Sequence, residues 1–390
     1  MRKIPQRHYL IGVAVLLVII LLYWFFVWRV QVYTNDAYVQ GNQIYITALH
    51  EGFVESIHTD DSFLVKKGQL LIKLDETDAR IALEQAKKQL AQVVREVCQA
   101  FHSVFVLEAE IHIQQAKQLK AKQDLKHRQG VIGANGVSRE DYEHAQDDLQ
   151  ARNAALKRTE NQYYKALAFI QGTTIPNHPS IQAASQRVRD TWVRLYRCNI
   201  YAPADGLVAQ RTIQVGMWVK PNNPLMSVIP LDQIWVNANY KETQLKHIRL
   251  GQQAKVTSDL YGSETVFHGK IVGLPGGAGN VFSLLPPQNL SGNWIKIVQR
   301  LPVRIALDPN ELKQHPLRLG LSMEVKTSIS TQSGRLVPCS SKGSPHYVTT
   351  IFQQEEAGDS ALIDEIISAN LDPNLKRYFL KPYTPPYSTQ

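Results

Sequence analysis

The chain has 390 residues, of which 44% are apolar, so it is large enough for two or three domains with cores of their own. Lys and Arg number 43 against 34 Asp and Glu, but the excess is spread along the chain. Because no nucleic-acid-binding motif accompanies this charge, we expect no nucleic-acid partner. Cys98, Cys198 and Cys339 are odd in number and far apart, which excludes a disulfide framework or a Cys-rich zinc site.

The first signal in chain order is an uncharged, apolar segment at residues 9–28. About 20 helical residues span roughly 30 Å, the thickness of a bilayer core. Three basic residues precede the segment and only Arg29 follows closely, so the positive-inside rule places the N-terminus in the cytoplasm. A cleavable signal peptide is the alternative, but the segment is longer than a usual signal core and no small-residue cleavage site follows it. We therefore predict a single transmembrane anchor, with the rest of the chain outside the cytoplasm.

Two distant segments, residues 46–75 and 200–229, match each other without a gap. Short β-branched runs separated by Gly, Asp, Asn and Pro predict strands and turns in each segment. The pattern alone predicts two paired strand modules. Their resemblance to the halves of lipoyl and biotinyl carrier domains implies that they close into one small β-sandwich. The identical pairs are Ile46 and Ile200, Ala48 and Ala202, Gly52 and Gly206, Val54 and Val208, Val65 and Val219, Lys66 and Lys220, and Leu71 and Leu225.

The insertion between the two halves has the composition of long helices. Residues 77–128 and 139–170 are rich in Ala, Gln, Lys, Glu and Leu and contain no Gly or Pro. Both carry apolar residues at seven-residue spacing, which is typical of a coiled-coil seam. These are Leu90, Val97, Val104, Ile111 and Leu125 in the first stretch, where Gln118 interrupts the series, and Tyr142, Leu149, Leu156, Tyr163 and Ile170 in the second.

Gly and Asn residues at 130–136 separate these two stretches, so the second helix runs back along the first. Ser138 followed by Asp141 predicts the N-cap of the returning helix. A further helical stretch near residues 180–196 follows a break that contains Gly and Pro. If this stretch continues the returning arm, the returning arm matches the outgoing arm in length. An antiparallel hairpin about 75 Å long results, at a rise of about 1.5 Å per residue. A globular four-helix core is the alternative, which we disfavour because one apolar seam runs down each arm.

Beyond residue 231, short strand-like runs separated by Gly and Pro predict an antiparallel β-barrel, with a long Gly- and Pro-rich loop at residues 273–293. The Ser-, Thr- and Pro-rich tail is predicted to be partly disordered, with one amphipathic helix near residues 361–369. The fold class is therefore mixed α and β, and elongated. The predicted domains are residues 1–29 as the anchor, 30–76 with 198–230 as the split lipoyl-like sandwich, 77–197 as the coiled-coil hairpin, 231–330 as the barrel, and 331–390 as the tail.

No pattern in the chain predicts catalysis or a bound cofactor. The Gly-rich run at residues 273–280 lacks a complete phosphate-binding motif, and the nucleophile-elbow, zincin and redox motifs do not occur. The 12 His residues are dispersed without ligand spacing. A lipoyl carrier needs an exposed Lys at the joint between its halves, and helices replace that joint here, so Lys66, Lys67 and Lys220 are not acceptors. We expect no enzyme, no cofactor and no metal.

The order of anchor, half-sandwich, hairpin, second half-sandwich and barrel resembles the HlyD family of membrane fusion proteins, and within it the EmrA type. The motifs that carry the resemblance are TNDAYVQG at residues 34–41, YAPADGLV at 201–208, the run at 228–245 and the long run at 282–308. They cover most of residues 30–330 in the right order, and the last of them is the most specific.

The resemblance implies a periplasmic adaptor for multidrug efflux, anchored in a Gram-negative inner membrane. Its implied partners are an EmrB-like major-facilitator permease, a TolC-like outer-membrane channel and further copies of the chain in a ring, with hydrophobic drugs as the cargo. Two alternatives stay open. One is an adaptor of the same fold for type I protein secretion or for export of a fatty acid or an aromatic acid, and the other is a membrane-anchored coiled-coil scaffold without a transport role.

The resemblance also implies a channel contact at the hairpin tip, at Arg128, Ile132, Asn135 and Ser138. The family pattern there is an Arg, an apolar residue four positions on, and a Ser seven beyond that. Arg128 and Ile132 match, but Ser138 comes one residue early. Ser138 is therefore either a channel contact or simply the helix N-cap. Arg128 is likewise either a channel contact or a solvated charge at the end of a helix.

Overall fold

The computed structural model describes residues 12–19, 30–131, 136–278, 281, 298–337 and 347–384. The chain divides into two compact units. The first unit consists of Met1–Lys73 with Ile200–Ile351 and contains the β-structure, and the second consists of Leu74–Asn199 with Phe352–Gln390 and contains the long helices.

Only part of the predicted membrane anchor lies within the described residues. Residues 12–19 are helical and exposed, and the remainder of the uncharged segment at residues 9–28 lies outside the described residues. Among the residues that the structure describes, no helix combines the length and the apolar character needed to cross a membrane.

The two repeated segments form a β-sandwich of two four-stranded sheets. One sheet has the strand order β2-β9-β7-β4 and the other has the order β6-β5-β3-β8. Each sheet contains strands from both segments, and each strand has its repeat counterpart at the same place in the other sheet. The strands are β2 (Ile44–Thr47), β3 (Gly52–Ile57), β4 (Leu64–Val65), β5 (Leu70–Leu74), β6 (Asn199–Tyr201), β7 (Gly206–Ala209), β8 (Trp218–Val219) and β9 (Pro224–Ile229).

The repeat extends to the backbone turns. Ser62 and its counterpart Gly216 both have positive φ, and so do Gly68 and its counterpart Asn222. The backbone therefore turns in the same way at equivalent points of both halves, although only one residue of each pair is a glycine. Gly206 is needed for a different reason, because a Cβ atom there would lie 2.6 Å from the carbonyl oxygen of Ile229.

A closed, antiparallel barrel of six strands forms the other part of the first unit. Its strand order is β1-β10-β13-β12-β11-β14. The alternating residues that point inward form one apolar core, which includes Val236, Tyr240, Phe267 and Ile305. The strands are β1 (Gln31–Gly41), β10 (Ile234–Lys241), β11 (Gln253–Ser258), β12 (Gly262–Gly273), β13 (Arg300–Leu307) and β14 (Ser322–Ser328). Between β12 and β13, most of the predicted loop lies outside the described residues.

The position of β1 corrects the predicted domain boundary, which assigned residues 30–76 to the sandwich. In the structure β1 pairs with β10 on one side, at Ala37 and Ala238, and with β14 on the other, at Val32 and Thr327. These pairings satisfy the backbone groups on both edges of β1 and close the barrel, so that no edge strand remains. The barrel is therefore built from two stretches of chain that the whole sandwich and hairpin separate.

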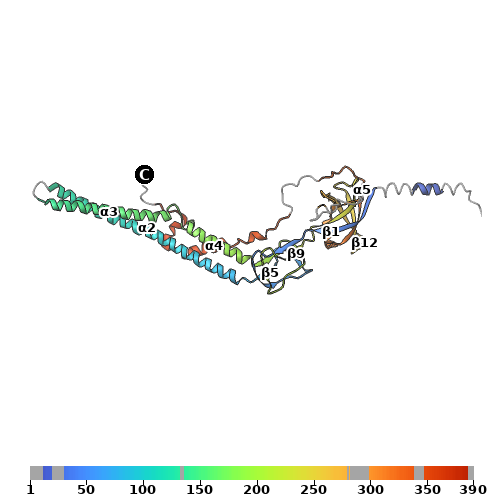
Figure 1. Ribbon diagram of the computed structural model, residues 1–390, viewed down its shortest axis with the longest axis horizontal. Coiled ribbons are helices and arrows are strands. Elements are labelled where there is room, and N and C mark those ends of the chain that lie inside the picture. Colours follow the sequence, from blue (N-terminus) through green and yellow to red (C-terminus); the bar gives the residue numbers. More distant parts are fainter. Residues whose placement is uncertain are drawn as a thin grey trace, which may run out of the picture. The chain divides into compact units, whose positions relative to one another are not determined.

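The helical hairpin consists of one long outgoing helix and two shorter returning helices. These are α2 (Thr77–Val131), α3 (Arg139–Ile170) and α4 (Pro179–Tyr196). Figure 1 shows α2 extending along the hairpin, with α3 and then α4 packed against it. The predicted heptad series is confirmed in the first part of the hairpin. Leu90, Val97, Val104 and Ile111 of α2 are all buried. Tyr163 and Ile170 of α3 are buried as well, whereas Leu125, Tyr142 and Leu149 nearer the tip are half-buried.

The break between α3 and α4 is a packed joint rather than a surface loop. Ile175 at its centre is fully buried. His178 caps α4, because its Nδ1 accepts from the backbone N–H of Ser180 at 3.2 Å. Its Nε2 lies 2.9 Å from the carbonyl oxygen of Phe169, so the ring joins the end of α3 to the start of α4.

The tail, predicted to be partly disordered with one amphipathic helix near residues 361–369, is ordered at residues 347–384, and this stretch includes the predicted helix. This stretch contains η3 (Ile351–Gln354), α7 (Asp359–Asn370), η4 (Pro373–Leu375) and α8 (Arg377–Leu380). Its apolar residues belong to the same core cluster as the seam of the hairpin. The composition suggested disorder because the segment has no core of its own and becomes ordered by packing against the hairpin. Residues 338–346 and 385–390 lie outside the described residues.

Candidate functional site

The hairpin tip brings Arg128 and Ser138 close to one residue of the returning helix, Asp141. The Arg128 side chain at the end of α2 pairs with Asp124 at 3.0 Å, and its Nη1 donates to the carbonyl oxygen of Asp141 at 3.0 Å. Arg128 thus joins the last turn of α2 to the first turn of α3. The other two predicted tip residues, Ile132 and Asn135, lie outside the described residues.

Ser138 is the N-cap of α3, as its sequence context predicted. Its hydroxyl oxygen accepts from the backbone N–H of Asp141 at 3.0 Å, and the hydroxyl donates to the Asp141 carboxylate at 2.7 Å. The hydrogen bond from Ser138 and the positive charge of Arg128 lower the pKa of Asp141 below its usual value. Ser138 is nevertheless exposed, so its role as the cap leaves it accessible at the surface of the tip.

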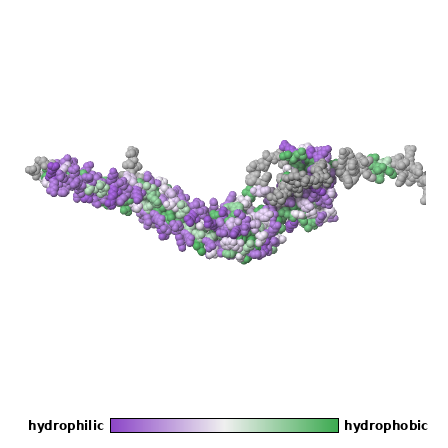
Figure 2. Space-filling view, viewed as in Figure 1, coloured by the Kyte–Doolittle hydropathy of each residue, from purple (hydrophilic) through white to green (hydrophobic). Residues whose placement is uncertain are grey.

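The two helices carry opposite charges as they approach the tip, a feature that the sequence analysis missed. The exposed charges on the end of α2 are mainly basic, whereas those on the start of α3 are mainly acidic. On the visible face, this end of the hairpin is predominantly hydrophilic (Figure 2). Such a surface suits a polar, water-accessible contact with another protein. The residues are Lys117, Lys120, Lys122 and Lys126 on α2, and Glu140, Asp141, Glu143, Asp147 and Asp148 on α3.

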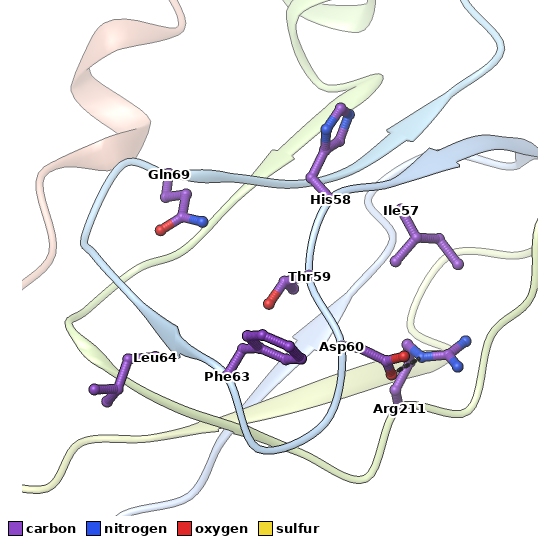
Figure 3. A pocket seen from close by; sticks show the side chains of 8 residues that line it. All are labelled: Ile57, His58, Thr59, Asp60, Phe63, Leu64, Gln69 and Arg211. Carbon is purple, nitrogen blue, oxygen red and sulfur yellow. Dashed lines mark hydrogen bonds and ion pairs between the residues drawn. The ribbon is translucent and has the colours of Figure 1, made fainter.

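A second candidate is an open pocket of about 450 Å³ in the sandwich, shown in Figure 3. Phe63 and Leu64 form its apolar wall, and both are more than 60% exposed. The Arg211 side chain donates to Asp60 at 2.7 Å, and this hydrogen bond lowers the pKa of the Asp60 carboxyl. Because the guanidinium of Arg211 is already paired, the pocket offers an incoming anion little charge.

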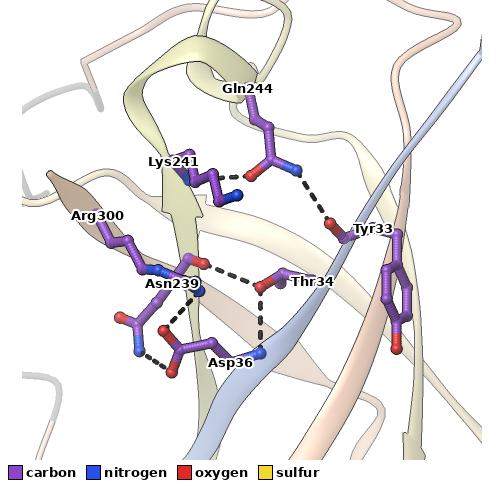
Figure 4. A network of polar contacts seen from close by, with 7 residues as sticks. All are labelled: Tyr33, Thr34, Asp36, Asn239, Lys241, Gln244 and Arg300. Atoms are coloured by element: carbon purple, nitrogen blue, oxygen red, sulfur yellow. Dashed lines mark hydrogen bonds and ion pairs between the residues drawn. The ribbon is translucent and has the colours of Figure 1, made fainter. Parts of the chain in front are cut away.

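The motif at residues 34–41 lies at an irregularity of β1, where the register shifts between Thr34 and Ala37. The Thr34 hydroxyl donates to the carbonyl oxygen of Asn239 at 2.9 Å, and the Asn239 amide donates to Asp36 at 3.0 Å. Arg300 at the start of β13 pairs with the same Asp36 carboxylate at 2.7 Å (Figure 4). The network ties three strands together at the bulge, so these motif residues maintain the barrel.

Comparison with known families matches the helical and barrel regions separately. Residues 77–198 match the family model for the EmrA α-helical hairpin domain. Residues 233–327 match the model for the AAEA-like β-barrel domain. An α-helical hairpin inserted in the chain between the two halves of a β-sandwich, together with such a barrel, defines the class of the membrane fusion proteins.

Similarity along the whole chain narrows the class further. The chain is 42% identical to the multidrug export protein EmrA of Escherichia coli (strain K12) over 349 residues, which is 90% of each protein. It is 38% identical to the fatty acid resistance protein FarA of Neisseria gonorrhoeae, over 86% of this chain and 84% of FarA. A structure of the periplasmic adaptor protein EmrA aligns with a TM-score of 0.39 and 19% identity, covering 77% of this chain and 98% of that one. The chain belongs to the EmrA family, the periplasmic membrane fusion proteins of multidrug efflux.

Proposed function

We propose that this chain links an EmrB-like major-facilitator permease of the inner membrane to a TolC-like channel of the outer membrane. The observation that carries the proposal is the 42% identity to a multidrug export protein over 90% of both chains. The uncharged segment at residues 9–28 supplies the inner-membrane anchor, with the N-terminus in the cytoplasm. Several copies assemble into a ring, and the permease supplies the energy for transport.

The contact with the channel lies at the hairpin tip and involves Arg128, Ile132, Asn135 and Ser138. Three features support this proposal. The tip carries exposed charges of both signs, Ser138 is exposed although it caps α3, and Arg128 holds the end of α2 to the start of α3. A polar tip of this kind binds through hydrogen bonds and charge pairs, for which helix ends offer unpaired backbone groups.

Deleting residues 130–136 tests the tip contact. We expect drug resistance to fall to that of a strain without the chain, while the protein still accumulates in the inner membrane, because the anchor and both β-domains are unchanged. Resistance in a strain lacking the native adaptor is the measurement. Unchanged resistance would contradict the tip contact.

A photo-crosslinking residue placed at position 132 or 135 tests whether the tip contacts the channel without changing the shape of the hairpin, which the deletion would alter. We expect each to crosslink to the outer-membrane channel. The control is the same residue at position 152, where Arg152 forms only a pair with Asp148 on its own helix. Equal crosslinking from all three positions would mean that the channel does not recognise the tip.

A fatty acid is the second candidate cargo, because FarA, at 38% identity, is named for fatty acid resistance. Hydrophobic drugs and long-chain fatty acids are both apolar. Measuring resistance to hydrophobic drugs and to long-chain fatty acids in the same strain decides between the two. Loss of resistance to fatty acids alone on deleting the gene would favour the second cargo.

A further inference from the structure

The returning arm of the hairpin is interrupted, whereas the outgoing arm is not. Helix α2 is continuous over 55 residues, but α3 ends at Ile170 and α4 begins at Pro179. Between them, Gly172 has a φ of +74°, so the helical hydrogen bonds do not continue through the joint. Within the hairpin, α3 and α4 are therefore linked across the joint by local contacts, such as that of the His178 ring with Phe169, and not by a continuous helix.

The C-terminal residues 352–384, which we term the brace, pack directly on this joint. The backbone N–H of Ile175, in the middle of the joint, donates to the carbonyl oxygen of Tyr378 at 3.0 Å. The Tyr378 ring lies 5.3 Å from that of Phe101 on α2, centre to centre. Tyr378 thereby connects the joint to the continuous helix opposite.

A second tyrosine of the brace reaches the helix on the far side of the joint. The hydroxyl of Tyr383 lies 3.4 Å from the hydroxyl of Tyr163 on α3 and donates to Glu108 of α2 at 3.3 Å. Its ring is 5.8 Å from that of Phe105. Tyr383 therefore fixes α3 to α2 just before the joint, and it is 5% exposed.

The brace also has buried apolar contacts with the hairpin. Ile363, Ile367 and Leu375 are at most 4% exposed, and all belong to the core cluster that contains Val104 and Ile170. Burying aliphatic side chains of this size removes apolar surface from water and stabilises the docked segment. The brace therefore docks firmly, in spite of its polar composition.

Charges on the two surfaces are complementary. Acidic side chains of the brace meet basic side chains on or beside α2 and α4. Glu355 pairs with Arg197 at 2.7 Å, Asp359 with Arg189 at 3.2 Å, and Asp372 lies 2.8 Å from His102. The carboxylates of Glu355 and Asp359 are more than 90% buried, and a buried charge without its partner is costly, so these pairs specify the position at which the brace docks.

We propose that the brace holds α3 in line with α4 across the joint, and that it sets the direction of the outer half of the hairpin. The brace contacts α2 and α4 on one side of the joint, and α3 and the joint itself on the other. Releasing it leaves α3 held by its packing on α2 and by the contact of His178 with Phe169, so that the outer half bends at residues 171–178. The inference goes beyond the proposed function, because it holds whichever channel or cargo the chain serves.

Distances between spin labels test the proposal in the full-length, membrane-extracted chain. The labels are attached to unnatural amino acids at the exposed positions 147 on α3 and 186 on α4, which leaves the native cysteines untouched. We expect a narrow distance distribution in the wild type. Ending the chain after residue 351 should broaden it about twofold, as expected when a locally supported joint loses its packing.

Two substitutions complete the design. Ile367→Ser introduces a polar group on the buried face of α7 and should broaden the distance distribution in an otherwise complete chain. This variant tests the proposal even if the truncated chain does not accumulate. Leu380→Ser is the control, because Leu380 is 83% exposed on α8 and should leave the distribution unchanged. An unaltered, narrow distribution in Ile367→Ser, or in an accumulating truncated chain, would overturn the proposal. The readout does not depend on transport, so a failure of the proposed function would not affect it.

Discussion

Tyr240 shows how a single buried hydroxyl influences the barrel. It is fully buried, and its hydroxyl lies 2.7 Å from Oγ1 of Thr327, which is also fully buried. Burial raises the pKa of Tyr240 to about 12, and the hydrogen bond with Thr327 opposes this shift in part. The side chain therefore stays neutral well above the pH at which a tyrosine of the unfolded chain ionises.

The raised pKa predicts an alkaline loss of stability. Below pH 10 the phenol is neutral in both states, so the contribution of Tyr240 is complete. Between about pH 10 and 12 only the unfolded state loses the proton, and the free energy of unfolding falls by about 2–3 kcal/mol at this site. Tyr240→Phe should be about 1 kcal/mol less stable at pH 8, because Thr327 loses its partner, and it should lack this alkaline decline.

Urea-unfolding midpoints of the full chain in detergent, followed by tryptophan fluorescence at pH 8 and pH 11, check the prediction. The difference between the wild type and Tyr240→Phe should shrink or change sign at pH 11. A difference that is the same at both values would mean that Tyr240 titrates normally in the folded barrel.

At the scale of the element, the apolar seam of α2 stabilises the hairpin on one face only. Val104 is fully buried in the seam, and Val106, two positions on, is 68% exposed. Val104→Ala should lower the free energy of unfolding of the hairpin by about 2 kcal/mol, because it leaves a cavity in the core. Val106→Ala should change it by less than about 0.5 kcal/mol, since alanine is also the better helix former.

Hydrogen exchange of α2 peptides in the full-length protein measures both variants. We expect faster exchange around residue 104 in Val104→Ala and no change in Val106→Ala. Similar exchange in the two variants would contradict the burial pattern of the seam.

The same elements show how far the sequence alone could predict the structure. The seam was predictable because burial of a helix face repeats along the chain with a fixed period. The two strand modules were predictable because they repeat each other, from Ala48 and Ala202 to Leu71 and Leu225, whereas their closure into one sandwich was implied by the resemblance to lipoyl and biotinyl carrier domains. At the candidate tip, the N-cap role of Ser138 could be predicted because it depends on neighbouring residues. The hydrogen bond from Arg128 to Asp141 could not, because it depends on the closure of the hairpin.

For the whole molecule, we expect the predicted anchor at residues 9–28 to hold the chain in the inner membrane. Replacing residues 1–29 by a cleavable signal peptide should release the chain into the soluble periplasmic fraction and reduce drug resistance. We expect this because no other segment of this length is both uncharged and rich in Leu, Ile and Val, and the uncharged run at residues 271–295 is instead rich in Gly, Pro and Asn. Fractionation followed by immunoblotting is the measurement, and retention in the inner membrane would contradict the assignment of the anchor.

Features that depend on neighbours along the chain or on a repeat could be predicted from the sequence: the long helices and their seam, the paired half-motifs, the turn between the arms and the uncharged N-terminal segment. That β1 closes the barrel and that the C-terminal segment packs on the hairpin became visible only in the folded structure. The reason is the distance along the chain over which the contacts form. Thr34 bonds to Asn239, and Tyr163 meets Tyr383, across more than 200 residues. Neither partner carries a local pattern that points to the other, so the pairing emerges only when the whole chain has folded.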